Sequence, residues 1–98
     1  MIVEIQVLPS PPGSPTDRWS HVDAAIAVIV QSGVHYEVGP LGTSIEGAPD
    51  VLWPLLRCVH EATLAAGADG VVSVIKVEQT RDPAVDPTMD DLVGKFRT

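Results

Sequence analysis

The sequence lacks most of the features that mark secreted or membrane-spanning proteins. Cysteine occurs once among the 98 residues, at Cys58, so the chain cannot form an internal disulfide bond. The longest apolar run, Ala24 to Val30, is far shorter than the roughly 18 residues that a membrane span requires. The first residues, Met1 to Glu4, contain no basic segment of the kind that opens a signal peptide. We therefore expect a cytoplasmic protein with no membrane partner.

Positive charge is scarce as well. Six lysines and arginines stand against thirteen aspartates and glutamates, which gives a formal net charge of −7. A chain of this charge repels phosphate backbones, and it contains no cluster of basic residues that could make a local exception. We expect no nucleic-acid partner. The same balance suits a cationic small molecule, although many acidic proteins of this size bind no cation.

Residues that hold metals or carry out catalysis do not occur at useful spacings. Cys58 and His60 are two residues apart on a predicted helix, so they point in different directions and cannot share a metal ion or form a nucleophile pair. His21 and His35 have no partner at ligand spacing, whereas a structural zinc site needs about four ligands. No glycine-rich phosphate loop follows a strand. We expect no metal, no cofactor and no enzymatic activity.

The hydrophobic pattern predicts an α+β fold. Alternating apolar and polar residues predict strands at 2–8 and 42–47, and the turn at Gly39-Pro40 pairs the latter with a strand at 34–38. A run of β-branched residues predicts a buried strand at 71–77. Helical spacing predicts helices over 15–32 and 49–66, with Ser14 as the cap of the first and Pro15 at its first position. A short last helix should begin after Thr88. The order β-α-β-β-α-β is that of the ferredoxin-like sandwich, a four-stranded antiparallel sheet with two helices on one face.

The length fits a single domain over residues 1–98, with a core at about 1–79 and a C-terminal extension at 80–98. The predicted hydrophobic core consists of Val3, Ile5, Val7, Ile26, Ile29, Leu52, Leu56, Val59 and Ile75. The other face of the sheet should mix charged and apolar side chains, among them Glu4, Lys76, Val72 and Val74. Since small domains rarely leave such a face bare, we expect a homodimer or homotetramer.

The segment from Tyr36 to Gly47 is the most informative part of the chain. Gly39-Pro40 predicts a tight turn between two short strands. Two hydroxyls and a carboxylate, those of Thr43, Ser44 and Glu46, follow this turn. Because side chains alternate along a strand, Ser44 and Glu46 share a face, and Thr43 joins them only if the strand is bulged. A hairpin does not need that carboxylate, so Glu46 is a candidate for binding.

These residues resemble the signature of the thiamine-binding protein family. The resemblance comprises Tyr36-x-x-x-Pro40-x-Gly42-Thr43-x-Ile45-Glu46-Gly47, Asp50, His60-Glu61-Ala62, Glu4-x-x-Val7-x-Pro9 and Val74-Ile75-Lys76-Val77 with Arg81-Asp82. It covers nearly the whole chain up to Asp82, and the proline-rich loop at 9–15 and the tail depart from it. It implies a ferredoxin-like fold, dimers or tetramers, and non-catalytic binding of thiamine or its hydroxymethylpyrimidine moiety.

The chemistry of that ligand suits the residues around the turn. A carboxylate can accept a hydrogen bond from the exocyclic amine of an aminopyrimidine, and it can offset a thiazolium charge, which also favours aromatic faces. The candidate ligand-binding residues are Glu46, Ser44, Thr43, Tyr36, Trp19, Trp53 and Lys76. The alternatives are structural: Glu46 caps the second helix or pairs with Lys76, and each tryptophan seals an end of the core.

Two other functions stay open at this point. One is an enzyme that uses Glu46 or His60 as an acid or base on a small metabolite. The other is a structural oligomer whose polar sheet face makes only contacts between subunits.

The predicted role of Glu46 can be tested with glutamine, which keeps the shape but loses the charge. Glu46→Gln should weaken thiamine binding about ten- to a hundredfold, since a hydrogen bond to a charged group contributes ~1.5–3 kcal/mol. A capping role predicts the reverse, lower stability with unchanged binding. Calorimetric titration of thiamine and hydroxymethylpyrimidine, with thermal melts in parallel, separates the two. Absence of binding to the unmodified protein at millimolar ligand would contradict the family inference.

Overall fold

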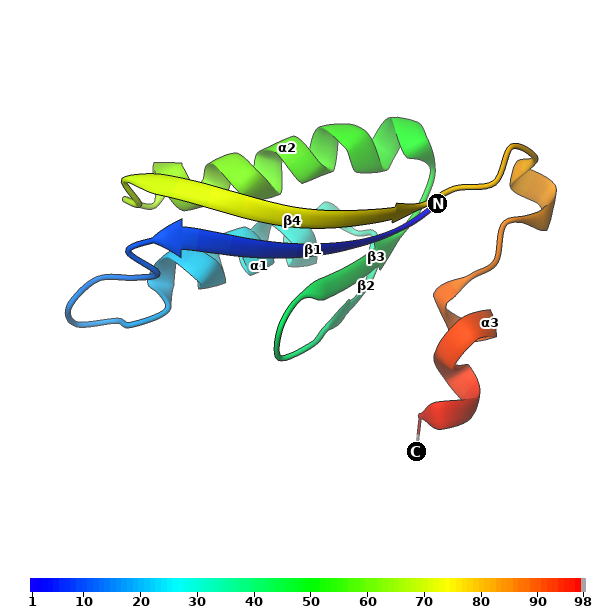
Figure 1. The fold of residues 1–98 in the computed structure, drawn as a ribbon, viewed down its shortest axis with the longest axis horizontal. Coiled ribbons are helices and arrows are strands. Elements are labelled where there is room, and N and C mark those ends of the chain that lie inside the picture. The colour runs from blue at the N-terminus through cyan, green and yellow to red at the C-terminus, as the bar shows by residue number, and fades with distance from the viewer. Residues whose placement is uncertain (98) are drawn as a thin grey trace.

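A computed structural model describes residues 1–97 of the chain. Its main elements are β1 (Ile2–Ser10), α1 (Ser20–Ser32), β2 (His35–Val38), β3 (Thr43–Glu46), α2 (Pro49–Ala65) and β4 (Gly70–Glu78). A short α3 (Met89–Val93) follows, between the 3-10 turns Pro83–Val85 and Gly94–Phe96. The strands form one antiparallel sheet in the order β2-β3-β1-β4, with α1 and α2 packed on one face (Figure 1). The predicted ferredoxin-like α+β fold is confirmed.

The core lies between the sheet and the two long helices. Alternation along β1 turns Val3 and Ile5 toward the helices, and their cross-strand neighbour Ile45 on β3 shares that face. The buried cluster that they form with the helices comprises Met1, Val3, Ile5, Ala25, Ile29, Ile45, Leu52, Leu55, Leu56 and Val59. Val3, Ile5, Ile29, Leu52, Leu56 and Val59 are therefore core residues as predicted.

The first helix begins at Ser20 and not at Pro15, so its predicted start is wrong. The Ser14 hydroxyl does accept a hydrogen bond from the Asp17 amide at 3.0 Å, but it stabilises a turn within the loop and not a helix. Within this loop, the carbonyl of Pro12 lies next to the start of the helix and accepts hydrogen bonds from the amides of His21 and Val22. Pro12 thus supplies the partner that the first amides of a helix need.

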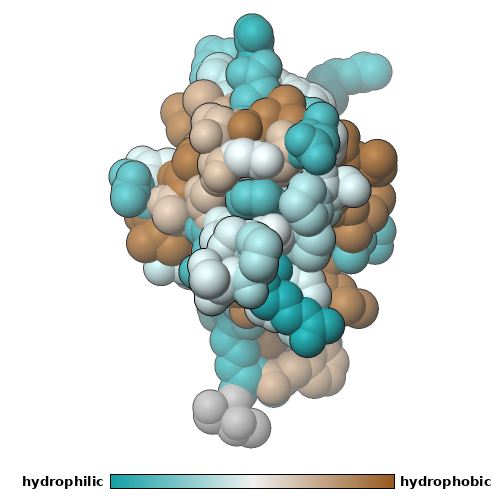
Figure 2. Space-filling view, turned by 90° about the vertical axis from the view of Figure 1, so that its left-hand side faces the viewer, coloured by the Kyte–Doolittle hydropathy of each residue, from teal (hydrophilic) through white to brown (hydrophobic). Residues whose placement is uncertain are grey.

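The outer part of the predicted core is only partly correct. Val7 is half-buried and packs against the core cluster, and Ile26 is half-buried, whereas Ile75 is 41% exposed and does not belong to the core. Ile75 lies on β4, which ends the sheet, so its helix-facing side chains reach the margin of the helical layer. Figure 2, which views the end of the molecule that carries the loop at 11–19, shows hydrophobic residues on both flanks of a mostly hydrophilic middle. Burial is therefore incomplete along the sides of the sandwich.

No helix within residues 1–97 combines the length and the apolar character that crossing a membrane would take.

Leu56 tests the helix face that the core uses. The side chain is buried between α2 and the sheet, so Leu56→Ala should lower the free energy of unfolding by about 2–5 kcal/mol. Leu64→Ala, on an exposed position of the same helix, is the matched control and should change it little. Denaturant unfolding followed by circular dichroism measures both. Equal stability of the two variants would show that Leu56 does not lie in the core.

Candidate functional site

One row of polar side chains crosses the uncovered face of the sheet, the face opposite α1 and α2. Ser44 on β3 lies opposite both Glu37 on β2 and Glu4 on β1, and Glu4 in turn lies opposite Lys76 on β4. Directly opposite residues of an antiparallel sheet share a face. The row therefore brings two carboxylates, a hydroxyl and an ammonium group side by side.

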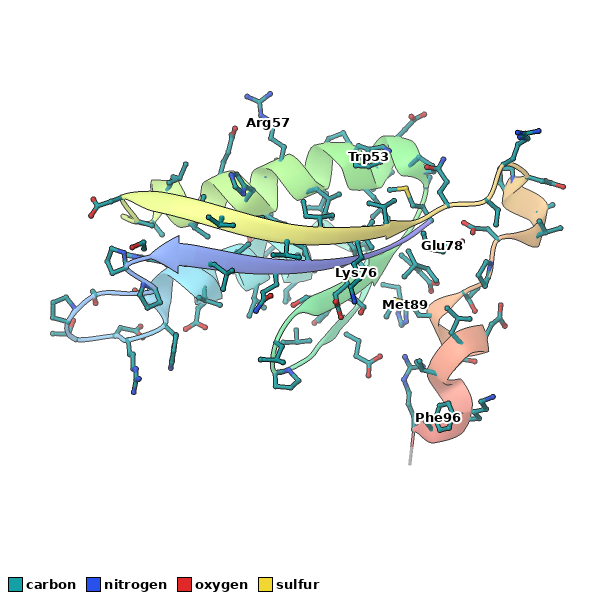
Figure 3. The ribbon with its side chains drawn as sticks, in the orientation of Figure 1. Trp53, Arg57, Lys76, Glu78, Met89 and Phe96 are labelled. Atoms are coloured by element: carbon teal, nitrogen blue, oxygen red, sulfur yellow. The ribbon has the colours of Figure 1, made fainter. Side chains whose placement is uncertain are left out.

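Residues 81–97, the C-terminal arm, fold back past the end of this face (Figures 1 and 3). Thr88 and Asp91 form a reciprocal capping box that starts α3. Met89 is buried, and its amide donates a hydrogen bond of 2.7 Å to Oε2 of Glu46. Because Met89 and Glu46 lie on separate elements, this contact ties the arm to the sheet.

The tip of the arm is held by charge. Arg97 donates to Oε2 of Glu37 at 2.5 Å and to Oδ1 of Asp90 at 3.2 Å. The hydrogen bond and the charge of Arg97 hold the pKa of Glu37 below its ordinary value, and Glu37 raises the pKa of Arg97. Both side chains are partly exposed, so solvent screens this pair.

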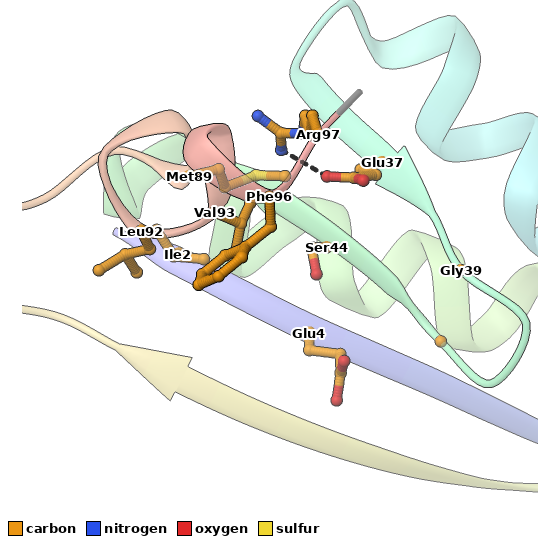
Figure 4. Close-up of a pocket in the computed structure, with 11 residues that line it drawn as sticks. Ile2, Glu4, Glu37, Gly39, Ser44, Met89, Leu92, Val93, Phe96 and Arg97 are labelled. Atoms are coloured by element: carbon orange, nitrogen blue, oxygen red, sulfur yellow. Dashed lines mark hydrogen bonds and ion pairs between the residues drawn. The ribbon is translucent and has the colours of Figure 1, made fainter.

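A hollow of about 430 Å³ lies between the arm and the polar row (Figure 4). It is lined by Ile2, Glu4, Glu37, Gly39, Gly42, Ser44, Met89, Leu92, Val93, Phe96 and Arg97. Ser44 and Glu4 contribute oxygen atoms from the strands, while Leu92 and Phe96 contribute apolar surface from the arm. A hollow of this size, mostly apolar with a few polar groups, is typical of sites for small organic molecules.

Glu4 is the carboxylate that is most available in this hollow. Its side chain is half-exposed, and its one ionic contact within residues 1–97 is Nζ of Lys76, at 3.7 Å from Oε1. Lys76 is itself largely exposed, so this pair is weak. Glu4 can therefore accept hydrogen bonds from a ligand without breaking a buried contact.

The beginning of the arm is anchored by a second acidic cluster. The amino group of Met1 donates to Oδ2 of Asp86 at 2.5 Å. This bond and the neighbouring Glu78 lower the pKa of Asp86, whereas the hydrogen bond to Asp86 and then burial raise the pKa of Glu78. The cluster joins the first residue and the beginning of the arm to Glu78, the last residue of β4.

The structure brings together few of the residues predicted to bind a ligand. Ser44 lines the hollow. Lys76 is not among the lining residues, but its ammonium group pairs with Glu4, which is. Glu46 is on the same face, as predicted from its two-residue spacing to Ser44, but one of its oxygens holds the Met89 amide. Thr43 is buried on the helix-facing side, so β3 has no bulge that would turn it toward Ser44.

The predicted aromatic residues lie elsewhere. Tyr36 is opposite Ile45, on the helix-facing side of β2. Trp19 lines a separate hollow between β1, α1 and the tip of the hairpin. Trp53 is half-exposed on α2, across the sheet from the polar row. A direct role in ligand binding stays a prediction for all seven candidate residues, Ser44 and Lys76 included.

Among the residues that line the hollow, only Ser44 was predicted to bind a ligand. The charged and aromatic lining residues that were not predicted are Glu4, Glu37, Phe96 and Arg97. The register of the hairpin could have indicated Glu37, because the bond from the Gly39 amide to the Gly42 carbonyl places Glu37 opposite Ser44. The two arm residues carried no such signal, since the position of the arm depends on contacts distant in sequence.

Within residues 1–97, no group of three histidines, cysteines, aspartates or glutamates could hold a metal ion. Cys58 is exposed, and Nδ1 of His60 is 2.5 Å from Oγ of Ser73, on the helix-facing side of β4. What the geometry defines is a ferredoxin-like domain with a hollow on its uncovered sheet face that has the size of a small organic molecule. Comparison with known proteins narrows this class.

The chain belongs to the thiamine-binding protein family, whose family model matches residues 3–97. It is 36% identical over 95 residues to a UPF0045 protein of Clostridium perfringens, covering 97% of this chain and 95% of that protein. Among solved structures, it resembles a domain of unknown function from Bacillus cereus, with 37% identity, a TM-score of 0.79, and coverage of 99% and 91% of the two chains. A candidate thiamine biosynthesis/salvage protein from Thermotoga maritima shares the fold, with 23% identity, a TM-score of 0.76, and coverage of 99% and 100%.

The contact between Arg97 and Glu37 predicts how the Glu37 carboxyl titrates. Because the pKa of Glu37 is lowered, the contact stabilises the docked arm at pH values above the ordinary pKa of 4.5. This contribution is lost as the pH falls through the lowered pKa. Arg97→Gln should raise the pKa of Glu37 toward 4.5. Carbon-detected NMR titration of the side-chain carboxyl measures it, with Arg57→Gln, on α2, as the control. An unchanged pKa in Arg97→Gln would show that the arm tip does not dock on β2.

Proposed function

We propose that the protein binds thiamine or its hydroxymethylpyrimidine moiety, without catalysis, in the hollow beneath the C-terminal arm. The observation that carries this proposal is the row of Glu37, Ser44 and Glu4 beneath an apolar wall that includes Phe96. Membership of a family named for thiamine binding supports the same ligand class. The volume of the hollow, about 430 Å³, lies in the range of small-molecule sites.

The groups in the hollow match the two ends of such a ligand. The Glu4 carboxylate can accept a hydrogen bond from the exocyclic amine, and the Ser44 hydroxyl can pair with a ring nitrogen. The Phe96 ring offers a face for a flat heterocycle, and the negative charge of Glu4 favours a thiazolium over a neutral ring. Glu46, which holds the Met89 amide, would then act on the ligand through the position of the arm.

The positions of Glu46 and His60, the candidate acid or base residues of an enzyme, support binding without catalysis. Glu46 is on the uncovered face of the sheet and bonds to the arm, whereas His60 bonds to Ser73 on the helix-facing side. The two groups therefore do not face a common hollow, so the geometry favours a binding protein over an acid–base enzyme.

We also propose that the protein self-associates, as a homodimer or homotetramer. The uncovered face exposes large apolar side chains, among them Leu8, Val72 and Val74. Several exposed large apolar side chains on one face commonly mark a protein–protein contact.

Glu4→Gln tests the proposed site. It keeps the side-chain shape and breaks only the weak pair with Lys76, so it should lower thiamine affinity roughly tenfold and leave the melting temperature nearly unchanged. Lys76→Gln removes a competing cation and should raise the affinity. Isothermal titration calorimetry with thiamine and hydroxymethylpyrimidine measures both variants.

Glu61→Gln is the matched control, because Glu61 is an exposed glutamate on α2 that also pairs with one cation, Arg57. It should leave thiamine affinity unchanged. Equal affinity in Glu4→Gln and Glu61→Gln would exclude the hollow as the binding site. No heat signal from the unmodified protein with either ligand would overturn the proposed function itself.

A further inference from the structure

The C-terminal arm covers the hollow but buries little apolar surface of its own. Met89 is buried, whereas Leu92 and Phe96 are 51% and 74% exposed. Figure 1 shows the arm beside the end of the sheet and apart from the layer that α1 and α2 form. Segments with few buried apolar contacts open at a low cost in free energy. The polar contacts of the arm therefore decide whether it stays docked.

Polar contacts hold the arm at three points. Arg97 holds its tip, and the amide of Met89 holds its middle. The third point is near its beginning, where the side chain of Asp86 bonds to that of Glu78, the last residue of β4. Figure 3 shows Glu78 at the end of the sheet from which the arm leaves. This third contact differs from the other two because both partners are carboxylic acids.

The carboxyl pair of Glu78 and Asp86 needs a proton to form its bond. An ionised carboxylate has only acceptor atoms, so two of them cannot bond to each other. Oε1 of Glu78 and Oδ1 of Asp86 are buried, and neither has a donor among residues 1–97. Two ionised groups here would leave both oxygens unpaired beside a like charge, which is unfavourable. One proton between the side chains satisfies both oxygens at once.

The surroundings of the carboxyl pair place this proton on Glu78. The amino group of Met1 donates to Oδ2 of Asp86 at 2.5 Å and so favours the ionised form of Asp86. This bond, followed by that to Glu78, lowers the pKa of Asp86, whereas the bond to Asp86 and then burial raise the pKa of Glu78. The other groups that face the pair are the Ile2 amide, beside Glu78, and the Thr80 hydroxyl, beside Asp86.

We propose that Glu78 and Asp86 share one proton and that this proton holds the C-terminal arm over the hollow, so that the arm opens as the pH rises. Ionisation of Glu78 removes the bond and sets two carboxylates against each other. The arm then loses the contact near its beginning and keeps only those of Met89 and Arg97. The effect on the arm is independent of any ligand, whereas the control of ligand binding that follows from it rests on the proposed function.

The direction of the pH dependence follows from the two carboxyl groups. Because the pKa of Glu78 is raised, its contribution to docking is complete below the ordinary value of 4.5 and is lost as the pH rises through the raised pKa. Because the pKa of Asp86 is lowered, its contribution is lost only as the pH falls through that lowered value. Docking is therefore strongest between the two pKa values. Each unit by which the pKa of Glu78 is raised changes the docking equilibrium by about tenfold.

The test follows the Met89 amide, whose hydrogen bond to Glu46 exists only when the arm is docked. Its protection against hydrogen exchange, measured by NMR without ligand, should fall about tenfold or more as Glu78 ionises. Glu78→Gln supplies an amide N–H in place of the proton, so protection in this variant should not change with pH. Glu61→Gln removes an exposed charge on α2 and should keep the pH dependence of the unmodified protein. His35, 3.9 Å from Glu46, is present in all three proteins, so its charge contributes equally.

A direct titration decides the question if Glu78→Gln fails to fold. Carbon-detected NMR of the unmodified protein gives the pKa of the Glu78 carboxyl, which should lie above 4.5. An ordinary pKa would overturn the shared proton, and so would an equal loss of Met89 protection in the unmodified protein and in Glu78→Gln. Protection that differs between potassium and a large organic cation at one pH would also overturn it, because an ion would then bridge the pair.

Calorimetric titration of thiamine separates this inference from the proposed function. The affinity of the unmodified protein should fall together with Met89 protection as the pH rises, and that of Glu78→Gln should stay constant. No heat signal at any pH would overturn the proposed function, while the shared proton stands or falls with Met89 protection. Constant affinity above an arm that opens would overturn the control of binding and leave the shared proton in place.

Discussion

The register of the four strands is the constraint on which the rest of the structure depends. Because side chains alternate, the pairing of Glu4 with Ser44 places polar groups on the uncovered face and turns Val3 and Ile5 toward the helices. A slip of one residue would exchange the two sets, burying Glu4 and exposing the core. The apolar alternation of β1 and the short turn between Gly39 and Gly42 act together against such a slip. Core and candidate site are therefore consequences of the same pairing.

The sequence could predict those features of the fold that depend on the local pattern of apolar and polar residues. The order of the elements, the split of Ser44 and Thr43 between opposite faces, and most of the core all follow from periodicities of 2.0 and 3.6 residues. The start of α1 could not be predicted in this way, because its first amides find their partner in the carbonyl of Pro12, at the far end of a loop. The exposure of Ile75 could not be predicted either, since periodicity gives the face of a side chain but not whether its strand lies inside the sheet or at its edge.

The candidate site was only partly predictable for the same reason. Ser44 was identified because it follows the turn, and Glu46 because a hairpin does not need its charge. The contact that explains Glu46 joins it to Met89, 43 residues later, and the one that closes the hollow joins Glu37 to Arg97, 60 residues later. Contacts at such separations leave no periodic trace. A carboxylate next to a turn thus identified the face of the sheet that carries the candidate hollow, but not the residues that the arm leaves free.

Lys76 connects the hollow with the edge of the sheet. Its ammonium group reaches Glu4, while its backbone belongs to the strand whose outer side has no partner within residues 1–97. Lys76 is thus one residue that takes part in both locations, through its side chain at the hollow and through its backbone at the edge. If the proposed binding and the proposed self-association both involve this residue, they are linked equilibria, and the linkage is reciprocal: a ligand that favours one assembly state is itself bound more tightly by that state. The affinity of such a protein for a small molecule would then be a function of its own concentration.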